Sequence, residues 1–193
     1  DDISRADMHI VCVGTPIDSF NTLDTTQLDS VVDSICRILD YGNTLVFRST
    51  LPVGTCRDYI SSLIEKTVGM IAGKDYCLCF APERTIEGNA LEELKRLPQI
   101  IGGLTTTCVR DTAEVFKTFT RTVIEVDNIE TAELTKLINN TYRDLSFAFA
   151  NEVSFICHSY NLNAHNVIAA ANEGYPRNPI PAPSPGVGGM CLV

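Results

Sequence analysis

Short apolar runs alternate with amphipathic segments over the first 127 residues, and this alternation constrains the fold more than any other feature. Apolar runs of about four to eight residues are typical of strands that are buried on both faces of a sheet. The segments between them have helical spacing, so the sequence predicts an α/β fold with βαβ units and a parallel sheet. The expected strands are 8–14, 44–50, 76–83, 98–103 and 122–127, and the expected helices are 25–42, 51–69 and 105–120.

The pattern changes after this α/β part, residues 1–127. Residues 129–161 have no strand pattern and carry apolar side chains at near-helical spacing, which predicts one long helix. A shorter helix is expected at 163–174, followed by a segment rich in proline and glycine. We therefore expect an all-helical part over residues 128–193. The apolar positions of the long helix are Leu134, Ile138, Leu145, Phe149, Val153 and Ile156.

The α/β part lacks the signature with which sheets that bind dinucleotides usually open, a strand followed by a G-x-G-x-x-G turn. The chain begins instead with "DDISRADMHIVCV", which is typical of a later strand and its lead-in. We therefore expect the C-terminal part of a Rossmann-like parallel sheet, with the first βαβ units missing.

Composition excludes several classes of function. The net charge of −9 argues against a nucleic-acid partner, because such proteins usually present a basic face. A small anionic ligand remains compatible, since a few local cations suffice to bind one phosphate group. The sequence has no apolar run of the roughly 18–20 residues that a membrane span needs, so no membrane partner is expected.

The eight cysteines favour a reduced, cytoplasmic chain. Those in apolar runs are expected to pack as small hydrophobic side chains. No C-x-x-C pair is present, so neither a zinc ribbon nor a thioredoxin-like site is expected, and no metal site is predicted.

Polar residues follow two of the expected strands. Ser49 and Thr50 end one strand in "STLPVGT", and Glu83 and Glu87 follow another in "APERTIEG". Ligands of open α/β sheets bind outside the carboxyl ends of the strands, so a hydroxyl and two carboxylates there could serve catalysis or ligand binding. Helix capping by the hydroxyls and favourable interaction of the acids with a helix dipole are the alternatives.

Two further motifs contain groups that could act in catalysis. In "ELTKLINN", Lys136 and Asn140 are four residues apart and share one helix face, where they could stabilise an oxygen that gains negative charge. In "GVGGMC", Cys191 follows a glycine loop and could act as a nucleophile. A solvated lysine and asparagine, and an inert tail, are the alternatives. No histidine stands in a motif with Cys191, so a Cys-His hydrolase is disfavoured.

Taken in order, five motifs resemble the UDP-glucose/GDP-mannose dehydrogenase family of nucleotide-sugar dehydrogenases. They are "VGTPID", "RSTLPVG", "FAPERTIEG", "AELTKLINNTYRDLSFAFANE" and "SPGVGGMC". The resemblance implies a partial NAD-binding Rossmann domain over 1–127 and a central dimerisation domain over 128–193. It also implies a homodimer formed through the long helix around 129–160, and two NAD-dependent oxidations of a sugar C6 alcohol to a carboxylate.

The resemblance also implies roles for individual residues. Cys191 is similar to the nucleophile that forms a thiohemiacetal and then a thioester, and Lys136 and Asn140 to the pair that stabilises its oxyanion. Glu83 is similar to the carboxylate associated with thioester hydrolysis, and Thr50 to the threonine that holds a catalytic water near the nicotinamide. The implied cofactor contacts are Thr15, Pro16, Thr50 and Glu87, and the implied substrate contacts are Glu83, Lys136, Asn140, Arg177 and Gly188.

The residues leave two other functions open. One is another Rossmann dehydrogenase of the 3-hydroxyacid or 6-phosphogluconate type, which uses a lysine but no cysteine. The other is a non-catalytic dimerisation fragment. Among nucleotide sugars, a UDP-N-acetylhexosamine or UDP-glucose is expected as the substrate.

Overall fold

The structure is a computed structural model, and it describes residues 6–18, 20, 22–86 and 88–184. The chain divides into two compact units, Asp1–Leu137 and Ile138–Val193. This division falls within the long helix that the sequence predicts. The domain boundary expected at residues 127 and 128 stays a prediction.

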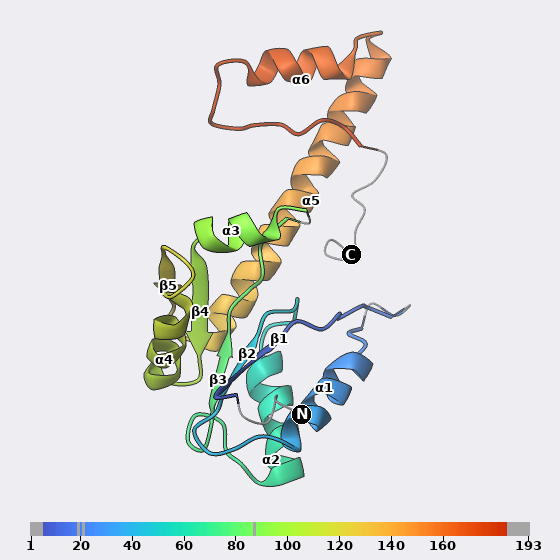
Figure 1. The fold of residues 1–193 in the computed structure, drawn as a ribbon. Coiled ribbons are helices and arrows are strands. Elements are labelled where there is room, and N and C mark those ends of the chain that lie inside the picture. Colours follow the sequence, from blue (N-terminus) through green and yellow to red (C-terminus); the bar gives the residue numbers. More distant parts are fainter. Residues whose placement is uncertain (1–5, 19, 21, 87, 185–193) are drawn as a thin grey trace. The chain divides into compact units, whose positions relative to one another are not determined.

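The first unit is built on a five-stranded sheet in which the strands stand in chain order (Figure 1). Every predicted strand is present, each within its expected range or shortened at its ends. The strands are β1 (Met8–Val11), β2 (Thr44–Phe47), β3 (Cys77–Phe80), β4 (Gln99–Gly103) and β5 (Val123–Glu125). The helices are α1 (Thr26–Cys36), a π-helical segment (Thr55–Ile60) that continues as α2 (Ser61–Val68), α3 (Ala90–Arg96) and α4 (Thr106–Phe116). The predicted long helix is α5 (Ile129–Ser159), and α6 (Ala164–Asn172) follows it.

The α/β class is confirmed, but one strand pairing differs from the expected parallel sheet. β1, β2 and β3 are parallel and so are β4 and β5, whereas β3 pairs with β4 in antiparallel fashion. The sequence analysis missed α3, which holds the connection at the carboxyl end of β3. The buried Glu93 of α3 accepts a hydrogen bond from the backbone N–H of Ile86 at 2.7 Å, and Pro98 then directly precedes β4. Since β4 begins at the carboxyl end of β3, it must run antiparallel to β3.

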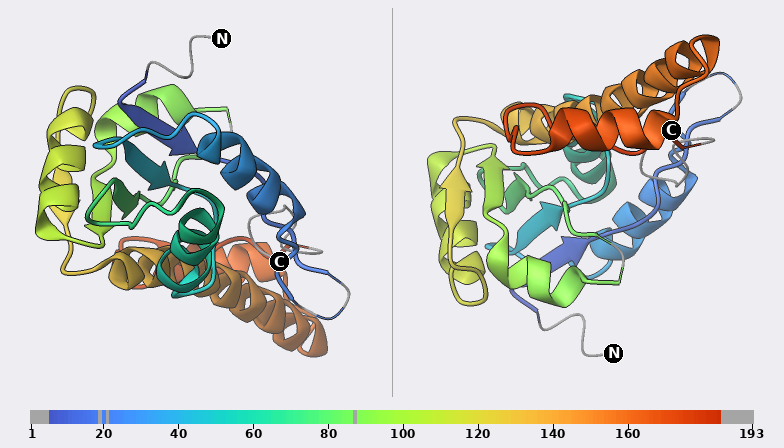
Figure 2. Two further views of the ribbon diagram at one scale, coloured as in Figure 1. Left: turned by 90° about the horizontal axis from the view of Figure 1, so that it is seen from below. Right: turned by 90° about the horizontal axis from the view of Figure 1, so that it is seen from above.

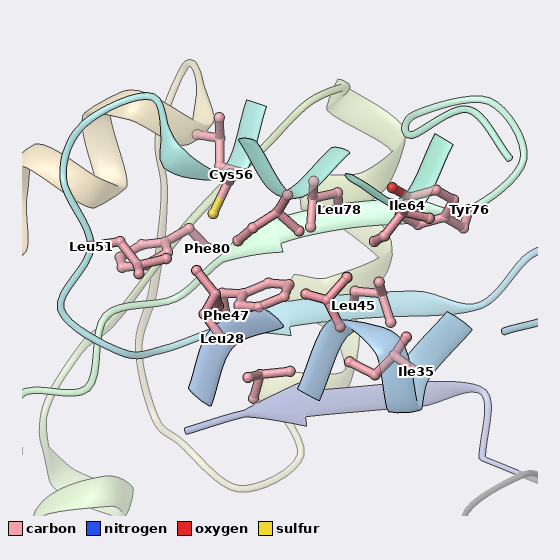
Figure 3. Close-up of a cluster of buried hydrophobic side chains, with 14 of the residues drawn as sticks. Leu28, Ile35, Leu45, Phe47, Leu51, Cys56, Ile64, Tyr76, Leu78 and Phe80 are labelled. Atoms are coloured by element: carbon pink, nitrogen blue, oxygen red, sulfur yellow. The ribbon is translucent and has the colours of Figure 1, made fainter. Parts of the chain in front are cut away.

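The two faces of the sheet are covered by different helices (Figure 2). Leu45 and Phe47 of β2 point into a core shared with α1, the π-helical segment and α2, part of which Figure 3 shows. Val46, between them in sequence, points to the opposite face, where it packs with residues of α4 such as Phe116. Burying each such side chain stabilises the fold by roughly 1.5–3 kcal/mol, which explains why these strands read as continuous apolar runs.

Gly102 in β4 allows α5 to begin directly against the sheet. A Cβ at this position would lie 2.4 Å from the carbonyl oxygen of Asn128 and 2.9 Å from the Cβ of Ala132. Ala132 is fully buried in the first turns of α5, so the neighbouring atoms belong to backbone and core and cannot move aside cheaply. The missing side chain therefore sets the distance between the sheet and the helix that carries Lys136.

We expect Gly102→Ala to lower the free energy of unfolding by about 1–3 kcal/mol, the usual cost of overpacking a core. Urea denaturation of the purified protein measures this loss. Gly14→Ala is the matched control, because a Cβ there meets only the flexible side chain of Gln27, at 3.2 Å. Equal stabilities of the two variants would contradict the argument from close approach.

The second unit contains the remainder of α5, α6 and the segment that follows them. Both polar atoms of the Asn172 side chain bond the backbone of Ile180, at 2.8 and 2.9 Å. The backbone N–H of Ser184 donates to Oδ1 of Asn151 on α5 at 2.9 Å. These side-chain amides fix the path of a segment that has no helix or strand of its own over the described residues 173–184.

Candidate active site

The carboxyl ends of β1, β2 and β3 meet at one edge of the sheet, because these three strands are parallel. The ladder continues past the strands, since the N–H of Arg48 donates to Val11 O and the N–H of Ala81 donates to Phe47 O, both at 2.9 Å. The polar residues that follow these strands in the sequence therefore lie at the same edge of the sheet.

Thr15 and Thr50 are in contact in the loops after β1 and β2. Oγ1 of Thr15 donates to the backbone oxygen of Thr50 at 2.6 Å, and Oγ of Ser49 donates to the backbone oxygen of Val13 at 2.6 Å. Both threonines are half-buried, and Pro16 is exposed beside them. Two reciprocal side-chain-to-backbone bonds thus fix the two loops to each other.

Lys136 reaches the same edge from α5. Its ammonium donates to the backbone oxygen of Glu83, and the residue is only 8% exposed. The structure therefore brings together four of the residues that the sequence analysis singled out: Thr15, Thr50, Glu83 and Lys136.

The carboxylate of Glu83 is held by three donors. Oε2 accepts from the Arg48 guanidinium at 2.7 Å, and Oε1 accepts from the N–H groups of Arg84 and Thr85, each at 2.8 Å. Burial alone would raise the pKa of Glu83, but the Arg48 charge and these hydrogen bonds outweigh it and lower the pKa below its ordinary value. The ion pair thus stabilises the fold above the ordinary glutamate pKa, and this contribution is lost as the pH falls through the lowered value.

Arg48 is a functional candidate that the sequence analysis missed. It directly follows β2, is 4% exposed, and also donates to Oε1 of Gln99 at 3.0 Å. Its guanidinium lies 5.4 Å from the centroid of the Phe116 ring. The available signal was a cation at the end of the apolar run "TLVFRST", since a buried charge needs a partner.

Glu133 is a second residue that the sequence analysis missed. It is fully buried on α5 and accepts hydrogen bonds from the N–H groups of Gly54 at 2.6 Å and Cys56 at 2.9 Å. These groups belong to the start of the π-helical segment, four and six residues after Thr50. The carboxylate thereby attaches the Thr50 loop to the helix that carries Lys136.

The remaining predicted site residues belong to the second unit or lie outside the described residues. Asn140 follows Lys136 by one helical turn of α5, is half-buried and belongs to the second unit. Arg177 is exposed in the second unit, and its guanidinium lies 5.8 Å from the Tyr175 ring centroid. Glu87, Gly188 and Cys191 lie outside the described residues.

Three further findings bear on the predicted chemistry. Over the described ranges, no group of three or more His, Cys, Asp or Glu side chains could hold a metal ion. The part of the chain that the structure covers contains no helix that is both long and apolar enough to cross a membrane. The cysteines within that part have free thiols, and the cytoplasmic location stays a prediction.

Two family descriptions match the chain. Residues 1–120 match the NAD binding domain of the UDP-glucose/GDP-mannose dehydrogenase family, and residues 130–193 match the central domain of the same family. Together the two matches cover nearly the whole sequence.

Curated relatives and solved structures agree with these matches. The chain is 33% identical over 192 residues to a UDP-N-acetyl-D-mannosamine dehydrogenase of Pyrococcus horikoshii, covering 100% of this chain and 45% of the relative. It is 35% identical to the enzyme of that name from Escherichia coli K12, covering 97% and 46%. The structure of UDP-D-ManNAc dehydrogenase from P. horikoshii superposes with a TM-score of 0.93 at 33% identity, covering 99% and 45%. That of UDP-N-acetyl-mannosamine dehydrogenase Cap5O from Staphylococcus aureus gives 0.85 at 40% identity, covering 97% and 45%. The chain thus spans less than half the length of these relatives.

Proposed function

Because the chain belongs to the UDP-glucose/GDP-mannose dehydrogenase family, we propose that it forms the cofactor side of a nucleotide-sugar dehydrogenase active site. The observation that carries this proposal is the meeting of Thr15, Thr50, Glu83 and Lys136 at the carboxyl edge of β1, β2 and β3. The substrate that we propose is UDP-N-acetylmannosamine, because the relatives compared above act on it by name. UDP-glucose is the alternative.

The residues at this edge fit the nicotinamide end of NAD. Dinucleotides bind outside the carboxyl ends of parallel strands, and the joined loops of Thr15 and Thr50 form a fixed rim there. Thr15, Pro16 and Thr50 would hold the cofactor from this rim, and Glu87 would contact it from the following loop. Bound NAD⁺ would accept the hydride in each of the two oxidations.

Lys136 would supply positive charge where the reaction generates negative charge on oxygen. The sugar C6 hydroxyl loses a proton and a hydride to give the aldehyde, and the Cys191 thiol adds to that aldehyde to give a thiohemiacetal. Loss of a second hydride and a proton leaves a thioester. Water then releases the carboxylate and restores the thiol. Lys136 and Asn140 stabilise the alkoxide and the oxyanions, while Thr50 and Glu83 orient water for the final hydrolysis.

Cys191→Ala in the full-length gene product tests this function against a dehydrogenase of the 3-hydroxyacid or 6-phosphogluconate type, which needs no cysteine. We expect formation of the sugar acid to fall by about a thousandfold or more, since the covalent route is lost. Reduced cofactor is followed by absorbance and the sugar products by mass spectrometry. Cys157→Ala, at a buried cysteine of α5, is the control for general disturbance. Survival of both oxidation steps in Cys191→Ala would rule out the thioester route.

The part of α5 in the second unit supports a homodimer. An exposed apolar stripe recurs along it at spacings of three, four and seven residues, the pattern of helices that pack against helices. A second copy of α5 would present the same stripe, so the two would be self-complementary about a two-fold axis. The stripe consists of Ile138, Tyr142, Leu145, Phe149 and Ile156.

We expect Leu145→Glu with Phe149→Glu to convert the dimer to monomer at micromolar concentration, because charges cannot be buried at such an interface without partners. Sedimentation velocity measures the change. Arg143→Glu lies on the other side of the helix and should leave the dimer intact. A dimer that persists in the double variant would place the interface elsewhere.

A further inference from the structure

The surroundings of Glu83 restrict what its carboxylate can do in the reaction. Oε1 already accepts two backbone N–H groups, and Oε2 accepts the Arg48 guanidinium. The side chain is nevertheless 36% exposed, so the carboxylate can still accept a hydrogen bond from a water molecule at the site. The geometry suits a carboxylate that orients water. It does not suit one that takes up the proton of that water, because protonation would remove the negative charge that the Arg48 guanidinium and the two N–H groups stabilise.

We propose that Arg48 is a positioning residue that keeps Glu83 ionised and fixed, so that Glu83 orients the hydrolytic water as a permanent anion and the proton passes elsewhere. The catalytic part of this inference rests on the proposed function. The structural part, an arginine that sets the charge state of Glu83, stands on contacts within the first unit alone.

Arg48 is itself held from several sides. Gln99 accepts from the same nitrogen, Nη2, that bonds Glu83, and the guanidinium also lies against the Phe116 ring. Gln99 is 4% exposed, and its amide nitrogen donates to the backbone oxygen of Leu97 at 3.2 Å, which fixes the direction of its acceptor oxygen. The guanidinium of Arg48 is therefore held in one orientation, and its hydrogen bond to Oε2 holds the Glu83 carboxylate in turn.

The reversed direction of β4 makes this arrangement possible. Gln99 is the first residue of β4, and it lies at the carboxyl edge of β2 only because β4 runs antiparallel to β3. In a fully parallel sheet the first residue of β4 would lie at the opposite edge. The contact between Gln99 and Arg48 is thus a consequence of the connection through α3, after which β4 runs antiparallel to β3.

The other charged groups near Glu83 agree in sign with this inference. Three cations lie near it, and desolvation raises the pKa of the neighbouring Cys12 thiol. The cations come from three different segments, and the charge of Arg48 lowers the pKa of the carboxylate. They are Arg48 after β2, Lys136 on α5 and Arg84 beside Glu83.

The test replaces Arg48 and measures the titration of Glu83 directly. Arg48→Met removes the charge, Arg48→Gln removes the charge but keeps a hydrogen-bond donor, and Arg48→Lys keeps the charge. The pKa of Glu83 is measured from side-chain carboxyl chemical shifts by NMR in the full-length gene product, assigned by comparison with Glu83→Gln. We expect the pKa to rise in Arg48→Met and Arg48→Gln, and to stay below its ordinary value in Arg48→Lys.

The catalytic readout is the pH profile of acid formation. In Arg48→Gln, the fall in rate on the acidic side of this profile should move to higher pH. The maximal rate should fall by about a hundredfold, because the water is no longer held in place. Arg48→Lys should restore the pH at which the rate falls on the acidic side, and part of the maximal rate. If Arg48→Met does not fold, Arg48→Gln decides alone, since it retains a polar contact.

Two results would overturn the inference. One is an unchanged Glu83 pKa in both neutral variants. The other is an acid limb that stays in place while all three variants lose activity equally, which would indicate a structural role only. Failure of the proposed function gives a different result, namely no NAD-dependent oxidation by the unsubstituted enzyme, with the NMR titration unaffected.

Discussion

Lys136→Met should reduce turnover of the nucleotide sugar by about a hundred- to a thousandfold, the usual cost of removing one group that stabilises a developing oxyanion. The ammonium is nearly buried and bonded to the backbone oxygen of Glu83, so its position is fixed before substrate binds. Methionine has a similar length and packs in the same space without charge. Both of the proposed oxidation steps should slow, because in the proposed route each passes through a negatively charged oxygen.

Steady-state kinetics of the full-length gene product measure this effect, with kcat and KM determined separately. Lys66→Met, at an exposed lysine of α2, removes the same charge away from the site and should leave kcat unchanged. A loss confined to KM would show that Lys136 only binds the substrate. A kcat within threefold of the unsubstituted enzyme would contradict the assigned role.

Glu133→Ala should lower the free energy of unfolding by about 3 kcal/mol. The change leaves the N–H groups of Gly54 and Cys56 without their acceptor in a fully buried place, and it also creates a cavity. The Thr50 loop loses its attachment to α5 as well, so catalysis should weaken even in folded protein. Urea denaturation at pH 7 gives the loss of stability, and the residual activity of the folded fraction gives the second effect.

Glu130→Ala is the matched control for this prediction. Glu130 lies three residues earlier on α5 and pairs with the exposed Arg57, so its removal should cost no more than about 1 kcal/mol. Equal destabilisation by the two substitutions would show that burial of the Glu133 carboxylate has no special importance. A Glu133→Ala enzyme that is as stable as the unsubstituted protein but slower would contradict the predicted loss of stability and support only the predicted loss of activity.

The sequence was sufficient for the strands and for most helices because their signals are local. The apolar run at 44–50 and the helical spacing of 129–161 depend only on neighbours within a few turns. The predicted direction of β4 was wrong because it does not depend on a local signal. It depends on α3, a helix of seven residues, and on contacts such as that of Glu93 with the N–H of Ile86, which no short pattern shows.

The same distinction holds for the site. Thr50, Glu83 and Lys136 could be singled out because strand ends and helix faces are positions that a sequence pattern marks. The partners that hold them could not be predicted in the same way. Arg48 and Glu83 are 35 residues apart, and Gly54 and Glu133 are 79 residues apart. Residues that position catalytic groups are paired only by the fold.

The buried cysteines give each face of the sheet its own chemical reporter. Cys36 and Cys56 lie in the core beneath α1 and α2, while Cys79 and Cys108 lie in the core beneath α4. A thiol reagent can modify them only when the covering helices open, so the labelling rate measures the free energy of that opening. Variants that keep the cysteines of one face would therefore show, by mass spectrometry alone, whether the two layers separate together or one before the other.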